Sequence, residues 1–334
     1  MNLSTDILAS LRLLPVVACA ALSTGVWAQS SVTLYGLFDI GIAHEKGDGK
    51  SLTKMDGSGM HSGNRLGFRG TEDLGGGNSA FFVLESGFNS DTGSLAQGGL
   101  AFGRQSFVGL QGKWGAVTAG RQYSPHWAAI DSMDPLDGIA GGSFNLMRRT
   151  VRTDNTLMYA TPNLSGFTGQ LAYGFGEVAG ESSGNRVLGG SLAYANGPLV
   201  VKLAHHNAKN ATATDTTRNT YLGGSYNFGP VKAVLGYQVE KGPSVVDANV
   251  ILVGAQIPLP AGTLMASYLR KNDKSAADND AQMLGLAYTY PLSKRTNLYT
   301  SVMKIRNDKA LIYRTKVGDG IGDREFNVGI RHKF

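Results

Sequence analysis

The sequence predicts an all-β protein, a sixteen-stranded antiparallel β-barrel that spans a membrane. Segments of about ten residues with alternating hydrophobicity recur from Ser31 to the C-terminus. Their number is even, and the connections between them are short and long in turn. Alternation with a period of two is typical of strands rather than helices. Strands that cross lipid must close into a barrel, because an open edge leaves backbone groups unsatisfied there.

Composition places the chain among ordered proteins. Of 334 residues, 46 are glycine and 17% are charged, and 31 Lys and Arg against 25 Asp and Glu give a net charge of +6. An apolar fraction of 42% excludes a disordered polyelectrolyte. The positive charges are not gathered into a stripe, so we expect no nucleic-acid partner.

Residues 1–28 are predicted to be a signal peptide. An apolar run follows Arg12 and ends at Val26 and Ala28, whose spacing suits signal peptidase. A retained membrane anchor and a lipoprotein-type cleavage at Cys19 stay open as alternatives. The remaining chain, 29–334, has no cysteine and no run of 18 apolar residues, so neither disulfides nor membrane-spanning helices are expected in it.

The alternation assigns a role to each face of the strands. Val32, Leu34 and Ile42 share the apolar face of the first strand, and Phe326 and Val328 share that of the last. The apolar face is expected to contact lipid and the polar face to line an aqueous lumen. The strands are expected at 31–43, 64–72, 78–88, 102–111, 114–122, 155–161, 167–175, 186–195, 198–206, 218–228, 231–240, 247–256, 263–271, 280–290, 296–306 and 324–334.

The connections predict which rim faces outward and which loop is functional. Tight turns such as 74–77 and 291–294 alternate along the chain with long polar loops, as in barrels with short periplasmic turns and long external loops. The longest connection, 123–154, has 32 residues, far above ordinary loop lengths. Its acidic residues come first and its basic residues last. If the connection folds inward, its carboxylates narrow the pore opposite basic residues of the wall. The alternative is that its charged residues are ordinary solvated surface charges.

Several motifs follow one another in the order of a single family: Ser31–Gly36, Asn64–Gly77, Leu84–Phe88, Gly103–Leu110, Gly120–Gln122, Asp154–Tyr159 and Val328–Phe334. In these motifs the chain resembles the neisserial-type general porins of Gram-negative outer membranes. The resemblance implies a homotrimer of sixteen-stranded barrels in outer-membrane lipid, passive diffusion of small hydrophilic solutes, and a third external loop folded into the pore. It also implies that Phe334 is the signal read by the barrel-assembly machinery.

Strand parity points to arginines in the lumen. Arg65 and Arg69 alternate with the apolar Leu66 and Phe68, so they are expected to face inward, since a guanidinium in hydrocarbon is costly. Arg104 is expected to do the same, because Gln105, Phe107 and Gly109 make the more credible outer face of the next strand. Arg121 has outward parity unless a bulge intervenes or the residue lies beyond the bilayer.

The resemblance adds a specific grouping of charge. It implies that Arg65, Arg104 and an arginine just before Asn155 form the basic cluster of anion-preferring members. The predicted basic residues of the constriction are Arg65, Arg69, Arg104, Arg148, Arg149 and Arg152, and the predicted acidic residues are Asp131, Asp134, Asp137 and Glu85.

The predicted function is that of an outer-membrane porin, not an enzyme, through which small hydrophilic solutes and inorganic anions diffuse passively. Arginines bind a passing anion weakly enough for release, and local charge matters more than net charge. A cation-preferring pore stays open if Glu85, Asp39 and the carboxylates of the long connection also face the lumen, and a substrate-selective porin is a further alternative. A barrel enzyme or a receptor-type barrel is a remote alternative. No cofactor or metal is expected, because the adjacent His205 and His206 face opposite sides of one strand.

Overall fold

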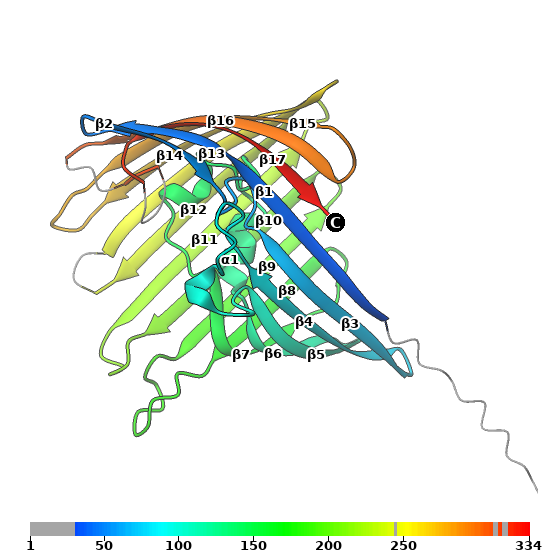
Figure 1. Cartoon of the computed structure of the whole chain (residues 1–334). Helices are drawn as coiled ribbons and strands as arrows, with labels where there is room; N and C mark the ends of the chain where they lie inside the picture. Colours follow the sequence, from blue (N-terminus) through cyan, green and yellow to red (C-terminus); the bar gives the residue numbers. More distant parts are fainter. Residues whose placement is uncertain (1–30, 244–245, 310–312, 316–319) are drawn as a thin grey trace, which may run out of the picture.

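The computed structural model confirms the predicted antiparallel barrel (Figure 1). It describes residues 31–243, 246–309, 313–315 and 320–334, so the predicted signal peptide lies outside the described residues. The described strands are β1 (Ser31–Gly47), β2 (Lys50–Asp56), β3 (Arg65–Gly75), β4 (Asn78–Gly87), β5 (Gln105–Gly112), β6 (Gly115–Tyr123), β7 (Arg152–Ala160), β8 (Phe167–Gly174), β9 (Val187–Asn196), β10 (Leu199–Lys209), β11 (Thr216–Asn227), β12 (Lys232–Gly242), β13 (Val246–Leu259), β14 (Gly262–Asp273), β15 (Ala281–Pro291), β16 (Thr296–Asn307) and β17 (Arg324–Lys333).

These 17 strands occupy sixteen positions around the barrel, because β2 and β3 lie end to end. β1 pairs with β2 along Gly41–Gly47 and with β3 along Ser31–Leu37. The residues between β2 and β3, 57–64, leave the wall and enter the lumen, where the N–H of His61 donates to the inward-facing Asp39. The sequence pattern did not predict β2, because this excursion interrupts the alternation that identifies a strand.

The barrel closes between its first and last strands. β17 pairs with β1 from Lys333 opposite Leu37 to Arg324 opposite Lys46. Beyond this ladder, Phe334 and Gly36 exchange two backbone hydrogen bonds of 3.0 and 3.1 Å. The Phe334 ring covers Gly36 so closely that a Cβ atom there would lie 2.3 Å from it. The last residue is therefore part of the seam that satisfies both sheet edges.

Most strands present the predicted faces, but β5 presents the opposite ones. The register sets Gln105 opposite Glu85, which faces the lumen, and the Phe107 ring packs edge-on against Phe81 with 6.2 Å between centroids. The outward residues of β5 include Val108, which is 58% exposed. The expected outer face of β5 is wrong, because the apolar Phe107 ring packs against the Phe81 ring inside the barrel instead of contacting lipid.

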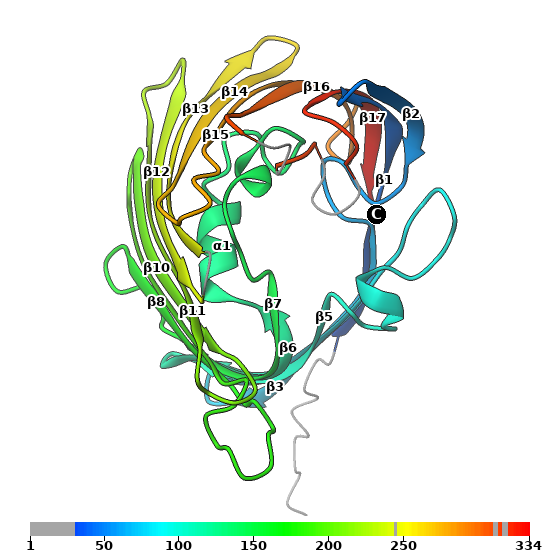
Figure 2. The same ribbon diagram turned by 90° about the vertical axis from the view of Figure 1, so that its left-hand side faces the viewer.

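The connection between β6 and β7 folds into the lumen. It begins with α1 (Pro125–Asp131), and a 3₁₀-helix, η2 (Ser143–Asn145), follows. Ser124 caps α1 by accepting a hydrogen bond from the N–H of Trp127 at 3.0 Å. Figure 2 shows α1 inside the ring, where it contacts β8–β11. Among the described residues, no helix has the length and hydropathy needed to cross a membrane.

An apolar core forms where this connection covers the inner wall. The connection contributes buried Ile130, Met133, Leu136, Ile139, Leu146 and Met147, and strands β11–β16 contribute Tyr221, Val234, Val250, Leu252, Met265, Leu269, Met283, Ala287, Tyr299, Met303 and Ile305. Burial of one such side chain contributes about 2 kcal/mol. The inner face of these strands is therefore largely apolar, whereas the alternation predicted a polar lining throughout.

Candidate pore constriction

Two segments enter the lumen and meet. His61, in the segment 57–64, donates from Nε2 to Oδ2 of Asp137 in the long connection at 3.1 Å. Gly138 lies against the carbonyl of His61, where a Cβ atom would come within 2.9 Å of the oxygen. The long connection thus crosses the lumen from the β6–β7 side to the segment held by β1, and this crossing narrows the pore.

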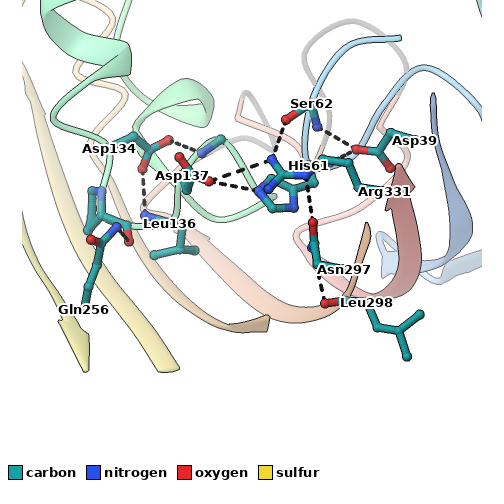
Figure 3. Close-up of polar contacts among 12 residues, drawn as sticks. Asp39, His61, Ser62, Asp134, Leu136, Asp137, Gln256, Asn297, Leu298 and Arg331 are labelled. Atoms are coloured by element: carbon teal, nitrogen blue, oxygen red, sulfur yellow. Dashed lines mark hydrogen bonds and ion pairs between the residues drawn. The ribbon is translucent and has the colours of Figure 1, made fainter. Parts of the chain in front are cut away.

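A buried carboxylate anchors the segment 57–64 (Figure 3). Asp39 of β1 accepts the N–H groups of His61 and Ser62 at 3.0 and 2.6 Å and the hydroxyl of Tyr299 at 2.5 Å. Arg331 of β17 donates from Nη1 to Ser62 Oγ at 2.9 Å. Sequence reasoning missed this anchor. The inward parity of Asp39 was its one signal, because nothing in the sequence shows that 57–64 turns inward.

Three predicted arginines lie together on the inner wall. Arg104 donates from Nε to Glu85 and from Nη2 to the hydroxyl of Tyr123, both at 2.7 Å. Arg152 donates to the same hydroxyl at 3.2 Å, with its guanidinium 4.8 Å from the ring centroid. Arg65 lies close enough to Arg104 for electrostatic repulsion. Tyr123, which sequence reasoning did not single out, therefore holds two guanidinium groups side by side.

Of the late arginines of the connection, Arg152 is the one that joins Arg104. Arg149 instead packs over Phe144 and Trp127, at 4.6 and 5.5 Å from the ring centroids, and burial lowers its pKa to about 10. The Arg148 side chain is exposed, and only its backbone N–H is anchored, at 2.7 Å from a carboxylate oxygen of Glu240. These two arginines belong to the surface of the connection rather than to the wall.

Two further arginines lie on β3 and β6. Arg69 has the inward parity of Arg65, and its guanidinium lies 5.3 Å from the ring centroid of Tyr35. At Arg121 the ladder between β6 and β7 shifts register, which is the bulge that the sequence analysis left open. The Arg121 guanidinium is tied to the carboxylate of Asp154.

Two predicted carboxylates are exposed in the lumen. Asp131 ends α1, and its exposed side chain lies within electrostatic range of Asp137 and of the wall residues Arg65 and Arg104. The Asp137 side chain is 65% exposed and lies 3.8 Å from Nη1 of Arg331. Desolvation raises the pKa of the Asp137 carboxyl, but the hydrogen bond from His61 and the charge of Arg331 outweigh it and hold this pKa below its usual range.

The other two predicted carboxylates hold parts of the constriction together. Asp134 is only 5% exposed, and it accepts the N–H groups of Leu136, Gly138 and Ser143 at 3.1 to 3.3 Å. Burial raises its pKa to about 7. Glu85 is buried between Arg104 and the Tyr35 hydroxyl, which donates to it at 3.0 Å. Asp134 therefore fixes the turn of the connection, and Glu85 orients Arg104, because buried carboxylates require such partners.

Acid is expected to loosen α1 through His126. This side chain is fully buried, with its ring centroid 6.1 Å from that of His206 on β10. Burial, with a smaller contribution from His206, lowers the pKa of His126 to about 3. The ordinary pKa of a histidine is about 6.5, so between pH 6.5 and pH 3 the state with α1 docked on the wall binds fewer protons than the undocked state. The free energy of docking α1 therefore becomes less favourable as pH falls, by at most about 5 kcal/mol.

Trp127 fluorescence in a Trp114→Phe background measures this undocking. The emission should shift to the red on acidification, and it should shift less when His126→Phe is added. An equal shift in both proteins would assign the effect to other groups.

Comparison with known proteins decides the family. The profile of the family described as Gram-negative porin matches residues 16–310. The chain belongs to this porin family. The porin is 34% identical to an outer membrane porin protein of Bordetella pertussis, over 96% of this chain and 99% of the relative. It is also 34% identical to outer membrane porin protein 32 of Delftia acidovorans, over 95% and 98%.

Further matches agree with the resemblance found in the sequence. Major outer membrane protein P.IB of Neisseria meningitidis is 25% identical over 96% of this chain and 99% of its own length. A solved structure, an anion-selective porin from Comamonas acidovorans, superposes with a TM-score of 0.78 at 32% identity and covers 92% of this chain and 100% of that one. The porin described here is therefore an outer-membrane channel through which solutes diffuse passively.

Proposed function

We propose that this porin prefers inorganic anions among the small hydrophilic solutes that it passes. The observation that carries the proposal is the grouping of Arg65, Arg104 and Arg152, two of them held by Tyr123. Glu85 offsets one of these three charges, which leaves 3 − 1 = +2 on the wall. Low-dielectric walls focus such a local field. The similar solved structure is that of an anion-selective porin from Comamonas acidovorans, which supports the same sign of preference.

The proposal includes processing and assembly. Residues 1–28 are removed as a signal peptide, and 29–334 form the barrel in outer-membrane lipid, with 123–154 as the constriction loop. The porin assembles as a homotrimer, after the barrel-assembly machinery has read Phe334. It acts without cofactor or catalysis, which an assay of lipid degradation on the purified protein can test.

Reversal potentials across a planar bilayer under a salt gradient test the anion preference. We expect wild type to prefer chloride, and Arg65→Gln to lower the chloride to potassium permeability ratio about tenfold at low ionic strength, since a unit positive charge some 6 Å from the ion stabilises chloride and destabilises potassium by about 0.7 kcal/mol each in water. Arg104→Gln should lower the ratio further, because it also leaves the Glu85 charge without its partner. The preference should weaken in about 1 M salt, where the screening length falls to about 3 Å.

A matched control lies outside the lumen. Arg295 is exposed beside the tight turn between β15 and β16, so Arg295→Gln should leave the reversal potential unchanged. A wild-type pore that prefers potassium, or a chloride preference that survives both lumen substitutions, contradicts the proposal.

A further inference from the structure

Two histidines are buried against each other where the long connection meets the inner wall. His126 lies in the first turn of α1, and His206 lies on the lumen side of β10. Both side chains are fully buried, with ring centroids 6.1 Å apart and ring planes inclined by 36°. Figure 2 shows α1 inside the ring, and α1 contacts β10. The sequence predicted no metal because His205 and His206 face opposite sides of β10, but the fold brings His206 to a histidine of the connection.

A glycine lets α1 come this close to the wall. The strand pairing sets His206 between Gly189 of β9 and Asn219 of β11. A Cβ atom at Gly189 would lie 3.4 Å from the ring of Pro125, the residue before His126. A larger side chain at Gly189 would therefore hold α1 away from His206.

The polar atoms around this contact lack partners. The ring nitrogens of His126 and His206, Oδ1 of Asn219 and Oε1 of Gln238 form no hydrogen bond with the part of the chain that the structure describes. Asn219 lies directly beside His206, and Gln238 lies close to His126 without meeting hydrogen-bond geometry. All four side chains are at most 1% exposed. A buried polar atom without a partner costs about 1 to 3 kcal/mol, so a ligand that binds several of these atoms at once is favoured.

The types of donor atom select the class of ligand. Neutral imidazole nitrogens are common ligands of zinc, copper and nickel ions, whereas calcium and magnesium prefer oxygen ligands throughout. Among the described residues, no group of three His, Cys, Asp or Glu side chains is placed to hold a metal ion. Two ring nitrogens and two amide oxygens can nevertheless fill the four positions of a tetrahedral site.

We propose that His126 and His206 bind a divalent transition-metal ion that clamps α1 to the wall. Asn219 and Gln238 complete the site with their amide oxygens. Nε2 of Gln238 donates to a carboxylate oxygen of Glu240 at 2.8 Å, which orients the amide and leaves its oxygen free. The ion holds the connection from behind and takes no part in solute passage, so the inference goes beyond the proposed function.

The spacing of the rings predicts a small closing movement on metal binding. Zinc binds an imidazole nitrogen at about 2.0 Å, which places each ring centroid roughly 3.2 Å from the ion, so two rings on one tetrahedral ion lie about 5 Å apart. From the observed separation of 6.1 Å, His126 has to move about 1 Å toward His206. This movement presses α1 against β10 and steadies the connection that narrows the pore.

Metal titration of the untagged porin, stripped with a chelator, tests the inference. In isothermal titration calorimetry, Zn²⁺ should bind at one site per chain that Mg²⁺ does not occupy. His126→Phe and His206→Phe, which keep an aromatic ring in the buried space, should each weaken this binding at least about a hundredfold, because loss of a residue that only supports a metal ligand already costs about 10- to 100-fold. His205→Phe makes the same change on the exposed outer side of β10 and should bind Zn²⁺ as wild type does.

The electron paramagnetic resonance spectrum of bound Cu²⁺ identifies the ligands directly. We expect coupling to two imidazole nitrogens in wild type and in His205→Phe, and to one in His126→Phe and in His206→Phe at saturating Cu²⁺. In planar bilayers, Zn²⁺ should lower the open-channel noise of wild type and leave that of His206→Phe unchanged. A heat-modifiable band on gels verifies that each barrel is folded.

Four results would overturn the inference. Absence of Zn²⁺ binding by wild type would mean that water satisfies the ring nitrogens. Equal Zn²⁺ binding by wild type and by both lumen variants would place the ion at exposed histidines, as would its loss in His205→Phe alone. Equal binding of Mg²⁺ and Zn²⁺ would assign the site to oxygen ligands. Zn²⁺ that binds at His126 and His206 without changing the noise of wild type would remove the role as a clamp.

Discussion

Leu136→Asp is expected to release the long connection from the inner wall and to widen the pore. Leu136 is fully buried, in a cluster with Ile139, Met265 and Tyr299. Truncation of such a leucine costs about 2 to 5 kcal/mol, and a carboxylate in its place adds the cost of burying an unpaired charge. The strand ladders do not involve this side chain, so the barrel should persist. Single-channel recordings should therefore show a larger, noisier conductance and a weaker chloride preference.

Two variants separate loop release from general damage. Leu136→Met keeps the volume and apolar character of the site, so it should cost less than about 1.5 kcal/mol and leave the conductance at its wild-type value. Leu100→Asp places the same charge at an exposed leucine of another connection, and this variant should also keep the wild-type conductance. A heat-modifiable band on gels verifies that each barrel is folded. Wild-type conductance in folded Leu136→Asp would show that the connection does not depend on this core.

The barrel itself could be predicted from sequence because its signal is local. Each strand carries its own alternation, and closure follows from the physics of backbone groups in lipid rather than from any long-range contact. The prediction of the faces failed where an apolar side chain on the inner face packs against residues that are distant in the sequence. Phe107 packs against Phe81, and the apolar inner residues of β11–β16 are covered by a connection more than fifty residues distant in sequence.

The constriction could be predicted only in part, for a related reason. Parity placed Arg65 on the inner wall, and the resemblance grouped it with Arg104. The partners that orient these guanidinium groups come from other strands, however: Glu85 from β4 and Tyr123 from the end of β6. The burial of Asp134 depends on how the connection folds back on itself, which its charge alone does not show.

Deletion of Phe334 is expected to destabilise the closing seam more than Phe334→Ala does. Deletion removes both backbone hydrogen bonds with Gly36 and leaves the N–H and C=O of Gly36 without these partners at the end of the seam. Each unpaired group costs several kcal/mol in lipid. Phe334→Ala keeps these bonds and loses only the ring that covers Gly36, which should lower the free energy of unfolding by about 1 to 2 kcal/mol because the ring is only partly buried. Refolding from urea into lipid vesicles measures both effects without any assembly machinery.

The same pair of variants separates the structural role of Phe334 from its proposed role as an assembly signal. If the machinery reads the aromatic ring, Phe334→Ala should lose most of its assembled porin in cells although it refolds well in vesicles. If the residue matters only as part of the seam, assembly in cells should follow the order measured in vesicles, with the deletion far below the alanine variant. His332→Ala, an exposed outward ring on the same strand, controls for the loss of an aromatic group near the C-terminus and should assemble normally. Near-normal assembly of Phe334→Ala in cells would therefore argue against the signal while leaving the seam intact.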